Sequence, residues 1–177
     1  MKLAEFAEEI QVEMLCIGHN IFLLSTHETY WNKLIEKIRT VYKGQLTYSA
    51  SSKQEFKKSG FWGQLDMVGM IADFEYRNHH QLSEKEVDAA MTDFIKSSEY
   101  MSKVWKKPVF ISRAFSHSAK DVSRENRVSK ISHEAQAVFY KSLMKAAFEH
   151  PSIKGIFWGD WIADYRFGGT KDGSLSP

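Results

Sequence analysis

Short apolar runs alternate with longer segments of helical periodicity along this chain, and this alternation limits the fold more than any other feature. Buried strands are expected at five places: Glu13 to Gly18, Gln45 to Ala50, Met67 to Phe74, Pro108 to Phe115, and Ile153 to Trp158. Strands that are separated by helices need crossover connections, which place them in a parallel sheet covered by helices. The expected fold class is therefore α/β.

The segments between these strands carry helix signals. Helices are expected at four places: Lys2 to Ile10, Ser25 to Tyr42, Ser83 to Trp105, and Ser132 to His150. Ser25 and Glu28 have the spacing of a capping box, and so do Ser83 and Glu86. Pro151 should end the last helix, because proline cannot continue the hydrogen-bond ladder.

Five strands form either an open doubly wound sheet or part of a (β/α)8 barrel. A complete barrel typically needs about 250 residues, and the five units already use nearly all of the 177 residues in this chain. As a barrel it would be incomplete. We expect one domain over residues 1–170 and a tail over residues 171–177. In either architecture, functional side chains should lie at the carboxyl ends of the strands.

The composition argues against several classes of partner. A net charge of +2, with basic residues scattered among acidic ones, predicts no nucleic-acid binding. No apolar stretch approaches the roughly 20 residues of a membrane span, so we expect no membrane contact. The first ten residues contain acids where a signal peptide needs an apolar run, which makes a cytoplasmic location the default. An export signal upstream of Met1 would change that expectation to secretion.

Cofactor and metal motifs are missing from the sequence. It contains no GxGxxG, Walker A or nucleophile-elbow pattern. His79 and His80 are adjacent, but no Cys, Asp or Glu stands at ligand spacing from them. Cys16 is the single cysteine, so it has no partner for an internal disulfide. We therefore expect neither a cofactor nor a metal.

Five segments, in order, resemble strand units four to eight of glycoside hydrolase family 113. They are CIGHN from Cys16, YWNKLIEKIRTVYKGQLTYSAS from Tyr30, FWGQLDMVGMIADFEY from Phe61, KPVFISRAFSHS from Lys107, and IKGIFWGDW from Ile153. The resemblance covers nearly the whole chain. It implies the second half of a (β/α)8 barrel, in a family of retaining glycosidases best known for acting on β-1,4-mannan.

The resemblance also implies which positions would perform the chemistry, and this chain departs from the family there. The general acid/base glutamate of the fourth strand is matched by Asn20, and the nucleophilic glutamate of the seventh strand is matched by Arg113. The eighth strand of the family usually has paired tryptophans, whereas here Trp158 is followed by Gly159.

These departures predict an inactive, pseudoenzyme half-barrel. A retaining glycosidase needs two carboxyl groups about 5 to 5.5 Å apart, and neither Asn20 nor Arg113 supplies one. The alternative is an active glycoside hydrolase with relocated carboxylates, using Asp160 together with Asp73 or Glu75. Under the inactive interpretation, Arg113 forms an ion pair with Asp73 or Asp160 instead.

Two kinds of partner follow from this interpretation. An oligosaccharide could stack on aromatic rings, for which the candidates are Tyr48, Trp62, Trp158 and Trp161. Trp31 and Trp105 fit helix stripes that face the core, so they are poorer candidates. A partial barrel also exposes unpaired strand edges, which proteins rarely tolerate. We therefore expect either self-association or completion by a polypeptide carrying the N-terminal half of the barrel.

Overall fold

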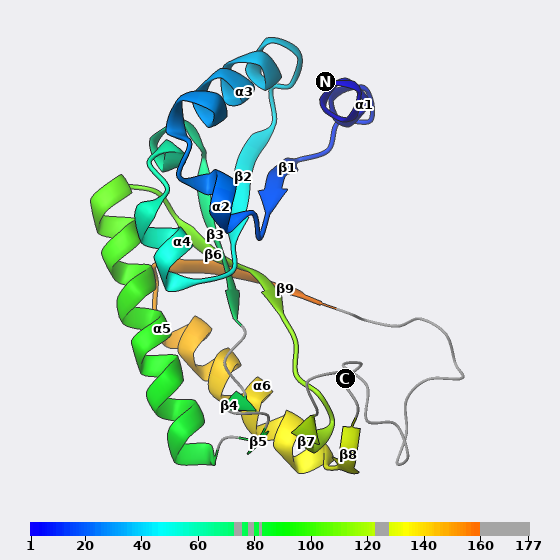
Figure 1. Cartoon of the computed structure of the whole chain (residues 1–177), viewed down its shortest axis with the longest axis vertical. Coiled ribbons are helices and arrows are strands. Elements are labelled where there is room, and N and C mark those ends of the chain that lie inside the picture. The colour runs from blue at the N-terminus through cyan, green and yellow to red at the C-terminus, as the bar shows by residue number, and fades with distance from the viewer. Residues whose placement is uncertain (73–75, 78–79, 82, 123–127, 160–177) are drawn as a thin grey trace.

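The computed structural model describes residues 1–72, 76–77, 80–81, 83–122 and 128–159 (Figure 1). Its strands are β1 (Met14–His19), β2 (Gln45–Ala50), β3 (Met67–Ala72), β4 (Tyr76–Arg77), β5 (His80–Gln81), β6 (Val109–Ala114), β7 (Ala119–Val122), β8 (Val128–Ile131) and β9 (Ile153–Trp158). Its helices are α1 (Lys2–Glu9), α2 (Phe22–Ser25), α3 (Glu28–Val41), α4 (Lys53–Lys58), the 3-10 helix η1 (Phe61–Gln64), α5 (Glu84–Trp105) and α6 (His133–Glu149).

The main sheet is parallel throughout, and its strands follow one another in chain order, β1-β2-β3-β6-β9. In a doubly wound sheet the strand order reverses at a switch point, whereas in a (β/α)8 barrel each strand pairs with the next one along the chain. The observed order is therefore that of consecutive barrel strands. The expected parallel strands are confirmed, and β2 and β9 begin and end where the sequence predicted.

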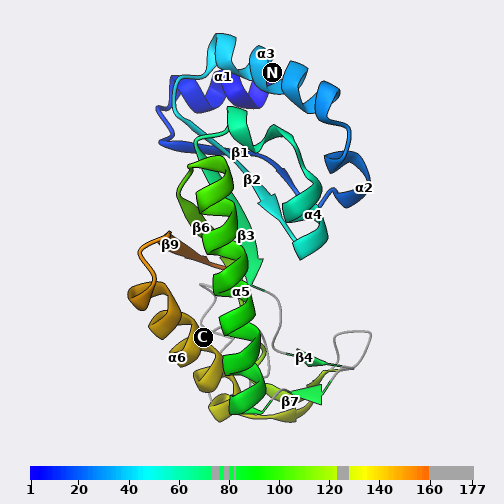
Figure 2. The same ribbon diagram turned by 90° about the vertical axis from the view of Figure 1, so that its left-hand side faces the viewer.

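Helices α3, α5 and α6 pack their apolar side chains against one face of this sheet (Figures 1 and 2). The core between the two layers contains fully buried side chains from both: Tyr42, Leu46, Tyr48, Ile111, Phe139 and Leu143. We refer to the other face, which carries no helix from the described residues, as the inner face. It corresponds to the interior of a barrel.

Alternation along each strand divides the side chains between the two faces. On β2, Leu46, Tyr48 and Ala50 join the core under the helices. Thr47 and Ser49, which stand between them, point to the inner face and line a pocket there. The inner face is thus more polar than the helical face, as expected where a site rather than a core is formed.

A second, antiparallel sheet was not expected from the sequence. It has the order β4-β5-β7-β8 and is built from the segments that follow β3 and β6 (Figure 1). These strands are two to four residues long, which is too short for an alternating pattern to be visible in the sequence. Both segments leave the carboxyl ends of main-sheet strands, where barrels place their functional loops.

One of the two expected capping boxes is confirmed and the other is wrong. Ser83 and Glu86 cap α5 reciprocally. Ser25, however, belongs to α2 and donates to Phe22 O at 2.9 Å, so α3 begins after His27 without a side-chain cap. No helix in the described part of the chain is both long and apolar enough to cross a membrane.

Candidate functional site

A pocket of about 330 Å³ opens on the inner face of the main sheet. Strands β1, β2, β6 and β9 supply its lining: Met14, Cys16, His19, Thr47, Ser49, Phe110, Ser112, Arg113 and Phe157. Arg113, which the sequence analysis singled out, lies here together with His19 and Ser49. None of the described residues that line the pocket is Asp or Glu.

The ring of Phe110 reaches across β3 because β3 has a glycine at that point. A Cβ at Gly69 would stand 3.2 Å from the Phe110 ring and 2.6 Å from Tyr48 O. Any side chain there would push the ring away from the strand. Gly69 therefore lets Phe110 form part of the apolar wall, where it meets Phe157 edge-on at a centroid distance of 5.5 Å.

Three polar side chains form a hydrogen-bonded row across the pocket. His19 Nδ1 lies 3.2 Å from Ser49 Oγ, and Ser49 Oγ lies 2.6 Å from Ser112 Oγ. The row joins β1, β2 and β6 at the level where a barrel holds its ligand. Because hydroxyl and imidazole groups both donate and accept, the row can adapt to a ligand hydroxyl of either polarity.

Asn20, which the resemblance matches to the acid/base glutamate, is exposed and has a left-handed backbone with φ of 50°. Its backbone N–H donates to Ser49 O at 3.1 Å. Its side-chain oxygen accepts a hydrogen bond from Ser51 Oγ. Asparagine tolerates the left-handed region better than most residues, since its short polar side chain can bond locally. Asn20 thus stabilises the turn after β1 and has no proton to give in acid catalysis.

Arg113, which the resemblance matches to the nucleophilic glutamate, lies along the end of β9. A Cβ at Gly159 would stand 2.7 Å from Arg113 Cγ, so the glycine makes room for the arginine side chain. Gly159 N also donates to Ala114 O at 2.8 Å, which holds the two strand ends together. The guanidinium carbon lies 4.7 Å from the centroid of the Phe115 ring, within the range of a cation–π contact.

A buried carboxyl group that was not predicted from the sequence lies next to the segment after β1. Glu55, on α4, is fully buried and accepts hydrogen bonds from Tyr48 Oη, from Ile21 N at 3.1 Å and from Ser51 N at 2.8 Å. These donors satisfy both oxygens of the buried carboxyl group and hold it in place. Ser52 accepts from Glu55 N at 3.1 Å and caps α4, and their Ser-x-x-Glu spacing is the signal that would have predicted this helix.

The Tyr48 hydroxyl is part of the same cluster. Burial, and then the hydrogen bond to Glu55, raise the pKa of Tyr48 well above its ordinary value of 10.0. Tyr48 therefore stays protonated and acts as a donor at all physiological pH values. Together, Tyr48 and Glu55 fix the chain segment after β1, which carries Asn20.

Two of the four expected sugar-stacking rings need correction. Tyr48 and Trp62 are both 0% exposed, so neither offers a ring face to a ligand. Tyr48 packs edge-on against Trp62 at 5.8 Å between centroids, and Trp62 Nε1 donates to Phe56 O at 3.0 Å. The physical reason is the strand alternation described above, which turns Tyr48 toward the helices. Trp31 is buried in the core, as its helix stripe predicted.

Trp158 is 36% exposed and meets Tyr140 of α6 edge-on at 5.1 Å between centroids. It does not line the pocket, although its neighbour Phe157 does. The remaining candidates, Asp73, Glu75, Asp160 and Trp161, lie outside the described residues. The expected ion pair of Arg113 with Asp73 or Asp160 therefore stays a prediction.

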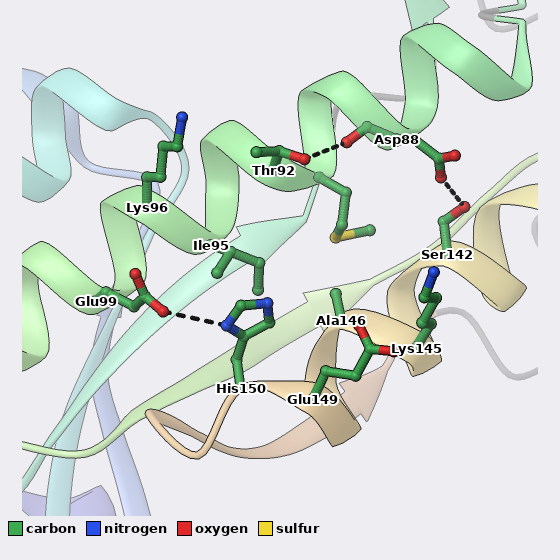
Figure 3. A pocket seen from close by; sticks show the side chains of 11 residues that line it. Asp88, Thr92, Ile95, Lys96, Glu99, Ser142, Lys145, Ala146, Glu149 and His150 are labelled. Carbon is green, nitrogen blue, oxygen red and sulfur yellow. Dashed lines mark hydrogen bonds and ion pairs between the residues drawn. The ribbon is translucent and has the colours of Figure 1, made fainter.

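A second hollow, of about 350 Å³, lies between α5 and α6 on the outer side of the molecule (Figure 3). Ser142 Oγ donates to Asp88 Oδ1 at 2.8 Å, and His150 Nδ1 lies 3.1 Å from Glu99 Oε1. Both pairs join one helix to the other (Figure 3). The polar groups of this hollow thus hold the helices together, and it lies away from the strand ends where the first pocket is found.

The strand order, with a polar pocket at the strand ends, defines the chain as part of a (β/α)8 barrel. The chain belongs to Glycoside Hydrolase Family 113, whose family model matches residues 1–172. No curated protein matches the chain.

Solved structures agree with this assignment of the fold. A GH113 β-1,4-mannanase superimposes with a TM-score of 0.79 at 21% identity, over 99% of this chain and 55% of that one. The β-mannanase AaManA from Alicyclobacillus acidocaldarius gives 0.73 at 23% identity, over 90% and 48%. A β-glucuronidase from Ruminococcus gnavus gives 0.67 at 9% identity, over 99% and 32%. This chain thus spans about half the length of the family structures that it matches.

Proposed function

We propose that the chain binds an oligosaccharide at the inner-face pocket without hydrolysing it, as a pseudoenzyme of its family. One observation carries the proposal: Asn20 and Arg113 occupy the two positions where the family resemblance places the acid/base and the nucleophile. Retaining hydrolysis needs one carboxyl to protonate the leaving oxygen and another to attack the anomeric carbon. An amide has no titratable proton, and a guanidinium has no nucleophilic electron pair at neutral pH.

The charge of Arg113 also opposes hydrolysis. The transition state of glycoside cleavage resembles an oxocarbenium ion and carries positive charge at the anomeric carbon. A permanent cation at the nucleophile position raises the energy of that state instead of lowering it. Binding of a neutral sugar is not opposed in this way, because sugar hydroxyls accept hydrogen bonds from guanidinium groups.

The pocket lining suits a sugar. The row of His19, Ser49 and Ser112 offers groups that both donate and accept, and Phe157 offers an apolar ring that is 55% exposed. Its volume of about 330 Å³ is at the lower end of the range for small-molecule sites. We therefore infer that it holds a short portion of a longer chain. Because the matched family structures are β-mannanases, β-1,4-linked manno-oligosaccharides are the ligands to test.

An activity assay tests the inactive part of this proposal. Purified chain is incubated with manno-oligosaccharides, and shorter products are measured by chromatography. We expect no product above a blank. Turnover that is retained in the purified protein and lost in Asp160→Asn would overturn the proposal.

That outcome would support the second candidate function, an active glycoside hydrolase with relocated carboxylates. One observation favours it. Ala72 pairs with Ala114, and Ala114 pairs with Trp158, so three neighbouring strands end at the same level. Asp73 follows Ala72 directly in the sequence, and Asp160 follows two residues after Trp158. Asp160 with Asp73 or Glu75 is the carboxylate pair that this candidate requires.

A titration tests the binding part. Tryptophan fluorescence is followed while manno-oligosaccharides are added, and we expect a saturable change. Ser49→Ala removes the central hydroxyl of the polar row and should weaken the binding. Ser142→Ala is the matched control, because Ser142 makes one side-chain hydrogen bond in the outer hollow between α5 and α6. Equal affinities for both variants would contradict the assignment of the pocket.

A further inference from the structure

A bulge in β6 turns Arg113 toward the inner-face pocket. In the pairing with β3, β6 advances from Ile111 to Arg113 while β3 advances by one residue, so Ser112 is an extra residue. The pairing of β6 with β9 shifts in the same stretch, between Ile111 and Ala114. In a regular strand, neighbouring residues point to opposite faces. Because of the bulge, Ser112 and Arg113 both line the pocket.

His19 reaches the pocket in the same way. Between Cys16 and His19, β1 advances by three residues while β2 advances by two. Cys16 lines the pocket, so regular alternation would also turn Gly18 toward it. Gly18 instead faces the helical core, where a Cβ would stand 2.7 Å from the rings of Trp31 and Tyr48. Each of the two bulges thus directs a nitrogen-bearing side chain into the same pocket, a use of bulges that is common beside functional sites.

The pocket combines neutral hydrogen-bonding groups with a permanent cation. Among the described residues that line it, none is Asp or Glu, and Arg113 carries a full positive charge at physiological pH. A guanidinium has five N–H donors in a planar fork that matches the two oxygens of a carboxylate. Two of these donors can bind a ligand carboxylate while the others keep contacts within the chain. The chemistry of the lining therefore favours an anionic group on the ligand.

The Arg113 side chain is held in place by its neighbours in the chain. It is half-buried, its Cγ lies against Gly159, and its guanidinium carbon lies 4.7 Å from the centroid of the Phe115 ring. A side chain that is already confined loses little conformational freedom when a ligand binds. Partial burial also strengthens its attraction for an anion, because the local dielectric constant is lower than that of water.

We propose that the pocket prefers an acidic oligosaccharide, whose carboxylate binds Arg113 and whose hydroxyls bind the row of His19, Ser49 and Ser112. This inference rests on the proposed function, because it names the class of sugar for the same pocket. A β-1,4-linked chain of mannuronate is the matched ligand. It has the linkage and configuration of β-1,4-mannan and differs only at C6, where a carboxylate replaces the hydroxymethyl group.

The experiment compares β-1,4-linked trisaccharides that have similar shapes and different charges. They are the mannuronate trisaccharide, its neutral methyl ester and mannotriose, and calorimetric titration of the purified chain at neutral pH and low ionic strength measures their affinities. We expect the mannuronate to bind about tenfold more tightly than either neutral sugar, the usual strength of a hydrogen-bonded charge pair. Added salt should reduce this preference, because salt screens the attraction.

Substitutions test whether Arg113 is the residue that recognises the carboxylate. Arg113→Met removes the cation and should make the three affinities similar. Arg113→Lys keeps the charge without the planar fork and should retain part of the preference. Lys145→Met is the matched control, since it removes a positive charge from the outer hollow between α5 and α6, and we expect it to keep the full preference. The ligand comparison on the parent chain decides the proposal even where a variant does not fold.

The outcomes separate this inference from the proposed function. Equal affinities of the parent chain for the mannuronate and its methyl ester would overturn the inference and leave sugar binding intact. A preference for the mannuronate that persists in Arg113→Met would overturn the assignment of the carboxylate to this arginine. If none of the three sugars binds, the proposed function itself is wrong, and the inference is wrong with it.

Discussion

The side chain of Arg113 lies against the backbone of Gly159, and each of the two residues limits what the other can be. A Cβ on Gly159 would stand 2.7 Å from Cγ and 2.9 Å from Nε of Arg113. The tryptophan that the family resemblance leads us to expect after Trp158 therefore does not fit beside this arginine. Arg113 and Gly159 are therefore structurally coupled.

The first prediction concerns this contact. Gly159→Ala should reduce the free energy of unfolding by about 1 to 2 kcal/mol, because Arg113 must leave its position. Gly155→Ala is the matched control, since a Cβ there meets no atom within 4 Å, and we expect it to be neutral or slightly stabilising. Urea unfolding of both variants measures the difference. Equal changes in stability would show that Arg113 moves aside without cost.

The second prediction concerns the buried carboxylate. Glu55→Gln replaces one acceptor oxygen by an amide that faces donors such as Ser51 N. We expect a loss of about 2 to 3 kcal/mol, the typical effect of leaving a buried donor without its acceptor. Glu36→Gln on the exposed side of α3 should stay within about 0.5 kcal/mol of the parent. Thermal or urea unfolding tests this, and similar losses for the two variants would contradict it.

The third prediction follows from the raised pKa of Tyr48. Above pH 10, the unfolded chain loses the Tyr48 proton, whereas the folded chain keeps it. The stabilisation is therefore complete below pH 10 and declines as the pH rises further. Between about pH 10 and 12, Tyr48 should account for a decline of up to about 1.4 kcal/mol per pH unit.

Tyr48→Phe tests this by removing the titrating group. We expect its stability to fall less steeply with pH than that of the parent chain, when both are measured by urea unfolding at matched ionic strength. Tyr30, which is 74% exposed, provides the control, and Tyr30→Phe should leave the slope unchanged. If the unfolding free energies of the parent and of Tyr48→Phe fall equally steeply with pH, the prediction is contradicted.

The fourth prediction concerns the backbone of Asn20, whose φ is 50°. Asn20→Gly should be neutral or stabilising, because glycine adopts this region freely. Asn20→Glu, which introduces the glutamate that the resemblance matches to this position, should lose about 1 to 2 kcal/mol, the typical cost of a left-handed conformation for an ordinary side chain. Differential scanning calorimetry compares the two. Equal melting temperatures would show that the turn after β1 relaxes around the new side chain.

The main sheet could be predicted from the sequence because each of its strands is a short run rich in apolar residues between helical segments. The run from Gln45 to Ala50 matches β2 to the residue. The second sheet could not be predicted, since β4 and β5 have two residues each and pair through contacts that are distant in the chain. Helix α3 was expected to begin with a cap at Ser25, but tertiary packing placed that residue in α2.

The site was predicted in part. Functional side chains were expected at the carboxyl ends of the strands, and Arg113 lies there beside His19 and Ser49, because these ends of parallel strands lie at one edge of a sheet. The aromatic residues were harder to assign, because the presence of a tyrosine near a strand end does not show whether its side chain faces the pocket or the helices. The alternation of Tyr48 with the polar residues Thr47 and Ser49 indicates that Tyr48 faces the helices. The contact between Arg113 and Gly159 could not be found, because it depends on how β6 and β9 are staggered.

The chain order of the main sheet has a consequence for how the protein acquires its structure. Each strand pairs with the next strand along the sequence, so the loops that must close during folding are short ones, and their entropy losses are modest. In a complete barrel, a single pairing joins the first strand to the last across the whole sequence. That slow, long-range step is not required for β1 to β9 to assemble one unit at a time.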